Sequence, residues 1–175
     1  MKRILFISTL LISISCFSQT NVSDILNKFK LGSKYEKSSD LKERFIDNDL
    51  VSFQYVGSET FKIGDVEITN INLLFYKNQL MVIELNIGNP YNKDDFDENE
   101  FNSVKGIMST EIGVTTAVKK NPNPEIINEI EWKKNSINYN LKRLKYKSDN
   151  INSILGLILL RDIKLSDNFM ANMKK

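Results

Sequence analysis

Apolar and polar residues alternate over most of the chain between residues 50 and 161, which is typical of strands with one face buried. In the run from Val66 to Tyr76 the apolar phase slips by one position between Ile68 and Ile71, and this predicts a β-bulge near Asn70. The alternation predicts an antiparallel meander of strands over residues 50–56, 60–63, 66–76, 80–87, 126–133, 136–146 and 153–161.

Helical spacing of apolar residues occurs in four other places. Residues 23–29 and 166–173 each predict a short helix, and residues 34–46 predict another because Leu41 and Phe45 are four apart. The acidic run over 94–100 suits the positive end of a helix dipole, and the apolar residues after it predict a helix that ends at Gly113.

Together these elements predict an α+β fold, in which helices pack on one face of antiparallel sheet meanders. Positions 71 apart match in size and phase, as in Phe61 with Trp132 and Val66 with Ile137. We therefore expect residues 19–175 to form a single domain. Residues 19–90 and 91–165 are either a tandem repeat of helix-strand units, or they are alike only as any two hairpins of an antiparallel sheet are. This layout is similar to that of the tandem-repeat beta-lactamase inhibitor proteins and of small envelope proteins with helix-helix-strand units.

The first eighteen residues have the order of a secretory signal peptide. Lys2 and Arg3 precede an apolar run of about eleven residues, short of the roughly 20 that a membrane-spanning helix needs. Cleavage after Ser18 predicts a periplasmic or secreted protein. Cys16 offers an alternative as a lipidated N-terminus, although no Leu stands three positions before it; we favour simple cleavage over an outer-membrane lipoprotein, and expect membrane attachment only with lipidation at Cys16.

Composition excludes several classes of function. Histidine is absent and Cys16 is the only cysteine, which removes catalytic sites and metal sites built on those residues. Lys2 and Arg3 account for the whole formal net charge of +2, so the remaining chain is neutral and ill-suited to bind nucleic acid. We expect neither a cofactor nor an enzyme.

A basic cluster is the strongest candidate for a binding surface. Lys142 and Arg143 belong to it, and Arg143, Lys145 and Lys147 have the spacing that places side chains on one face of a strand. Such a row favours an acidic partner or an anionic surface. The alternative is a solvated sheet face or an edge strand whose lysines prevent aggregation.

The sequence gives weaker support for other kinds of site. Trp132, the only tryptophan, would stack on a ligand or, as is more common, pack in the core. The acidic run starts like a calcium loop at Asp95, but Glu100 occupies the position that requires glycine, so we predict no metal site. Glu129 and Glu131 are a carboxylate pair that sugar hydrolysis could use, and also an ordinary strand surface.

The sequence therefore favours an exported, non-catalytic binding protein of the bacterial cell envelope, which engages an unknown envelope protein through an exposed sheet face or loops. The first alternative is a periplasmic or lipid-anchored carrier of a lipid or small apolar ligand. The second is a hydrolase that uses carboxylates. The oligomeric state is left open.

Overall fold

The computed structural model describes residues 21–91, 95–114, 117–118, 123–148 and 150–173, with the side chains of residues 117–118 excepted. The elements in chain order are α1 (Val22–Lys28), β1 (Leu41–Asp47), β2 (Leu50–Tyr55), β3 (Phe61–Ile63), β4 (Val66–Tyr76), β5 (Gln79–Ile87), α2 (Glu98–Ile112), β6 (Ala117–Val118), β7 (Ile126–Lys134), β8 (Ile137–Ser148), β9 (Ile151–Asp162) and α3 (Ile163–Met173).

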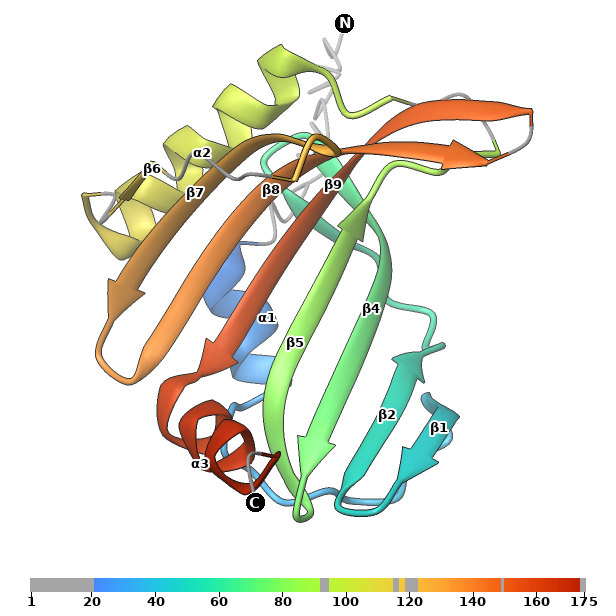
Figure 1. Cartoon of the computed structure of the whole chain (residues 1–175), viewed down its shortest axis with the longest axis vertical. Coiled ribbons are helices and arrows are strands. Elements are labelled where there is room, and N and C mark those ends of the chain that lie inside the picture. Colours follow the sequence, from blue (N-terminus) through green and yellow to red (C-terminus); the bar gives the residue numbers. More distant parts are fainter. Residues whose placement is uncertain (1–20, 92–94, 115–116, 119–122, 149, 174–175) are drawn as a thin grey trace, which may run out of the picture.

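The described strands form one antiparallel sheet, and the fold is α+β as predicted. Its strands lie in the order β1-β2-β4-β5-β9-β8-β7-β6, and β3 pairs with β4 outside this path (Figure 1). The two halves of the chain meet where β5 pairs with β9. β1 is therefore the last strand at one end of the sheet, with β2 as its only neighbour among the described strands.

The core lies between the sheet and the helices α1 and α2, which are behind the strands in the view of Figure 1. α2 begins at a capping box, in which Asp97 accepts from the Glu100 backbone at 2.8 Å and the Glu100 side chain accepts from the Asp97 backbone at 2.9 Å. Its buried residues are Phe101, Val104 and Met108, at the spacing of one helix face.

α3 differs from the expectation that the helices share one face of the sheet. Phe169 of α3 meets Tyr76 edge-on at 5.3 Å between ring centroids, and the Asn172 amide donates to the Tyr76 hydroxyl at 2.6 Å. Tyr76 follows Phe75, whose side chain belongs to the core cluster, and side chains alternate between faces along a strand. α3 therefore contacts the face opposite to α1 and α2.

The predicted helix over residues 34–46 is wrong. Its second half is strand β1, paired antiparallel with β2. Arg44 is an extra residue in this strand, because Glu43 pairs with Phe53 and Phe45 pairs with the next residue, Ser52. Because of this bulge, Leu41 pairs with Tyr55 and Phe45 with Ser52 on opposite faces of the sheet, so their spacing of four residues does not mark a shared face.

The bulge predicted near Asn70 is confirmed, because the register of β4 against β5 shifts between Ile68 and Asn70. A second shift follows between Leu74 and Phe75. It brings Leu80 opposite Phe75 and into the core cluster, which the plain alternation of β5 did not predict.

Candidate functional site

The edge strand β1 is the most exposed strand that the structure describes. Six of its seven residues are exposed, among them the large apolar side chains of Phe45, at 48%, and Ile46, at 62%. The backbone N–H and C=O groups on the outer side of an edge strand lack ladder partners and can pair with another strand. Exposed apolar residues on such an edge mark a place where a second chain can add.

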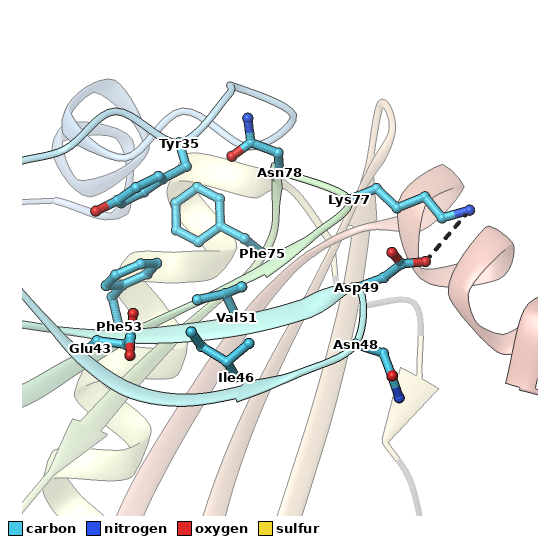
Figure 2. A pocket seen from close by; sticks show the side chains of 10 residues that line it. All are labelled: Tyr35, Glu43, Ile46, Asn48, Asp49, Val51, Phe53, Phe75, Lys77 and Asn78. Atoms are coloured by element: carbon cyan, nitrogen blue, oxygen red, sulfur yellow. Dashed lines mark ion pairs between the residues drawn. The ribbon is translucent and has the colours of Figure 1, made fainter.

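A groove of about 430 Å³ lies beside this edge, on the face of the sheet that carries the core (Figure 2). Val51 and Phe53 of β2 and Phe75 of β4 form its floor, while Tyr35 lies on the opposite side from Ile46 (Figure 2). The remaining lining residues are Glu43, Asn48, Asp49, Lys77 and Asn78. This volume is within the range of small-molecule sites, but the groove is open along one side.

The groove exists because the cover over β2 becomes thinner along the strand. Tyr55 is covered by the C-terminal end of α1 and the residue after it: the Lys28 ammonium lies 4.7 Å from the centroid of the Tyr55 ring, and the Phe29 ring meets it edge-on at 5.4 Å. Phe53 is covered by Tyr35, which stacks on it at 4.5 Å with the rings 9° from parallel. Val51, the next residue on this face, is only partly buried.

Backbone hydrogen bonds hold Tyr35 over the groove. The chain turns at Gly32, whose φ of 80° is in the left-handed region that favours glycine. The Gly32 N–H donates to the Leu80 carbonyl at 2.8 Å, and the Tyr35 N–H donates to the Asn78 carbonyl at 3.0 Å. The wall of the groove is thus fixed to the β4–β5 hairpin.

Some of the charged side chains around the groove form an ion pair, and one carboxylate does not. Lys77 and Asp49 form an ion pair at 3.8 Å, and since both side chains are more than half exposed, the pair contributes little to stability. Glu43 is exposed, and its carboxylate has neither a hydrogen bond nor an ion pair with any residue in the described ranges. The groove therefore offers an apolar floor and one unpaired carboxylate.

The basic cluster predicted from the sequence is divided between the two faces of β8. Lys142 lies 3.5 Å from Glu129 across the β7–β8 ladder. Arg143 points to the other face and donates from Nε to the Phe96 carbonyl at 3.0 Å, which gives it a structural contact. Lys145 and Lys147 share the face of Arg143 and are exposed.

Trp132 is fully buried, and its indole N–H donates to the Ser109 hydroxyl at 3.3 Å. The structure thus places it in the core, where it packs instead of facing solvent. The alternative role for Cys16 lies outside the described residues.

The carboxylates considered for chemistry are engaged in the fold. Glu129 accepts from the Asn140 amide at 2.8 Å, and Glu131 accepts from Asn138. Asp95 accepts from the Ile154 backbone N–H at 2.7 Å. Within the described parts of the chain, no group of three or more His, Cys, Asp or Glu side chains is placed to hold a metal ion.

Lys28 and Tyr139, which both lie outside the groove, have shifted pKa values. Partial burial lowers the pKa of the Lys28 ammonium, but hydrogen bonds to Glu59 and Tyr55 outweigh it, so that this pKa is raised above the ordinary value of 10.5. Burial, with a smaller effect of Glu111, raises the pKa of the Tyr139 phenol above 10.0.

Comparison with known proteins gives no match: no protein-family model fits the chain, and no curated protein or solved structure is significantly similar to it. No described helix is both long and apolar enough to cross a membrane. The exposed edge strand was missed because the spacing of Leu41 and Phe45 predicts a helix over residues 34–46. The available signal was an apolar pair between charged residues, directly before the Asn48-Asp49 turn.

Proposed function

We propose that the chain is an exported, non-catalytic binding protein of the bacterial cell envelope, and that it holds an extended segment of a protein partner along β1. This proposal rests on one observation: the exposed edge strand β1 lies beside the groove, where the core is incompletely covered. A strand that adds to β1 gains backbone hydrogen bonds, and its alternate side chains enter the groove.

The energetics favour an occupant at this edge. Ile46 and Phe45 keep about half of their surfaces in water. Burying an apolar side chain of this size stabilises a complex by roughly 1.5–3 kcal/mol when the burial is complete, so the two exposed fractions together offer about 2–3 kcal/mol. The charges on β1 balance, with Lys42 and Arg44 against Glu43 and Asp47, so the strand has no net charge that would repel a partner as a whole.

The proposal that the chain is exported rests on the signal-like pattern of residues 1–18, with cleavage after Ser18 favoured over lipidation at Cys16. A periplasmic or secreted binding protein meets folded and extended segments of other envelope proteins. An edge strand is a suitable receptor for the extended ones.

We also propose that the two halves arose by duplication. Phe61 pairs with Ile68 in the β3–β4 hairpin, and Trp132 pairs with Tyr139 in the β7–β8 hairpin, so the two hairpins have the same register 71 positions apart. The turns correspond as well, since Gly64 and Asn135 have φ values of 62° and 55°.

The centre of the sheet supports the same relation. Asn86 of β5 pairs with Leu157 of β9, and these residues are themselves 71 positions apart. Two equivalent antiparallel strands that pair in this way are related by a local twofold axis. One end of the sheet is formed by β2, with six residues, and β1, with seven. The other end is formed by β6, with two residues. The residues that line the groove beside β1 all belong to the first half.

A carrier of a small apolar ligand is the second candidate, favoured by the apolar floor and the volume of about 430 Å³. A ligand of this kind would fill the groove and leave the outer backbone groups of β1 free. A strand would occupy both, and this difference separates the two candidates.

Site-specific photo-crosslinking tests the proposed function. A benzoylphenylalanine residue replaces Phe45 in one variant and Lys147, an exposed residue of β8, in a matched control. Both variants are expressed as full chains and irradiated in cells. We expect one dominant protein adduct at position 45 that is lost in the additional variant Ile46→Asp. Adducts at position 147 with none at position 45 would contradict the proposal.

A further inference from the structure

We infer that the segment held at β1 carries a Lys or Arg and, two positions away, a large aliphatic or aromatic residue. The cationic residue faces Glu43, and the apolar residue covers Ile46 and Val51. This inference rests on the proposed function and adds to it the chemistry of the partner.

The spacing follows from the register of the hairpin. Glu43 and Ile46 are three positions apart in β1, but the bulge at Arg44 brings them opposite Phe53 and Val51, which are two positions apart in β2. An added strand that keeps this register likewise faces Glu43 and Ile46 with two residues separated by one. Both point to the core face of the sheet, where the groove lies (Figure 2).

The cationic residue follows from the unpaired carboxylate. In the free protein Glu43 is solvated, so its lack of a partner costs nothing. A strand that lies over it removes that solvent, and a carboxylate without a compensating donor is then strongly unfavourable. A Lys or Arg opposite Glu43 supplies the donor, whereas an acidic residue there adds repulsion, so this position selects between partners.

The same molecule contains an example of this arrangement two residues along β2. Lys28 lies over the Tyr55 ring at 4.7 Å and donates to the Glu59 carboxylate. Phe53 is covered by Tyr35, so a cation on an added strand would contact the Glu43 carboxylate and not the face of the Phe53 ring. The fold thus already pairs a lysine with a carboxylate at the edge of this core, as the added strand would at Glu43.

The apolar residue of the bound segment is inferred from the incomplete burial of the core at this edge. Val51 is partly buried at the edge of the core cluster, and Ile46 on the same face is 62% exposed. A Leu, Ile, Val or Phe side chain placed over both extends the cluster outwards. A second copy of this chain is the competing occupant, but in its own β1 the side chain of Arg44 lies with Phe45 on the face opposite to Ile46.

Peptide titration followed by amide NMR shifts of the folded protein tests the inference. The probes are blocked heptapeptides of Thr that carry Lys and Leu two positions apart, in both orders, since an added strand can run in either direction. The matched controls replace Lys by Glu, or Leu by Ser. A reversed-charge protein, Glu43→Lys, is titrated with the same set, and sedimentation of the free protein measures self-association.

We expect one order of the Lys/Leu peptide to bind at β1 about five- to tenfold more tightly than its Glu counterpart, with the preference inverted in Glu43→Lys. Equal binding of the Lys and Glu peptides, unchanged by Glu43→Lys, would overturn the inference and leave strand addition standing. Failure of every peptide to shift β1 amides would contradict the proposed function as well. A free protein that is a dimer through β1 would assign the edge to a second copy.

Discussion

Gly156 is the position where a single methyl group should affect the fold most. It lies on β9 opposite Ile87 of β5, in the central pair of strands. A Cβ placed there would lie 2.7 Å from Cδ1 of Phe96 and 2.9 Å from Cβ of Ile87. Neither neighbour can yield cheaply, because the Ile87 Cβ is bonded to the β5 backbone and Phe96 is only 1% exposed.

We therefore expect Gly156→Ala to destabilise the protein by about 1–3 kcal/mol, which is the usual cost of overpacking a core. For a chain of this length, that corresponds to a fall in Tm of roughly 2–12 °C. The assay is urea unfolding followed by the fluorescence of Trp132, which is the only tryptophan and is fully buried.

Gly106→Ala is the matched control. Gly106 lies in the middle of α2 and is exposed, and a Cβ added there would meet nothing within 4 Å. The same chemical change should therefore stabilise by about 0.5–1 kcal/mol, because alanine favours the helix. The double variant Phe96→Leu with Gly156→Ala should be less destabilised than the sum of its single changes. Equal stability of Gly156→Ala and the parent protein, or the same sign for both glycines, would refute the packing argument.

Three further outcomes are expected. Asp97→Ala removes the cap of α2 and should cost about 1 kcal/mol in urea unfolding, with no loss expected if the capping box is not formed. Thermal stability should fall above about pH 10: the contribution of Lys28, whose folded pKa is raised, is lost as the pH passes that pKa, and the Tyr139 phenol ionises more readily in the unfolded chain. Lys28→Met should make this fall shallower, and an unchanged slope would contradict the assignment. Ile46→Asp should leave the urea midpoint nearly unchanged, since the side chain is 62% exposed, but should abolish binding at β1.

The sequence predicted the elements that obey a simple period. The alternation in β4 and the slip near Asn70 are both present in the sheet, because the alternating apolar residues there face a continuous core, namely Val66, Ile68, Ile71, Leu73 and Phe75. The strand β1 was not predicted from the sequence, for the opposite reason. It is an exposed edge with a bulge at Arg44, so neither burial nor a regular phase marked it as a strand.

The groove was beyond prediction from the sequence because it is made by segments that are distant along the chain. Tyr35, Val51 and Phe75 come together only through the pairing of β2 with β4 and the hydrogen bond from Tyr35 to Asn78. The basic cluster shows the reverse case. Alternation correctly separates Lys142 from Arg143, but the pattern does not reveal that Arg143 binds the Phe96 carbonyl.

Hydrogen exchange of the protein in complex with its crosslink-identified partner tests the central claim most directly. The amides to follow are those of β1, which is the edge of the sheet, and those of Lys145 and Lys147, which are exposed on β8. The account predicts that complex formation slows exchange along β1, where outward-facing N–H groups gain strand partners, and leaves Lys145 and Lys147 unchanged. Slower exchange at Lys145 and Lys147 with none at β1 would contradict it and assign binding to the basic surface instead.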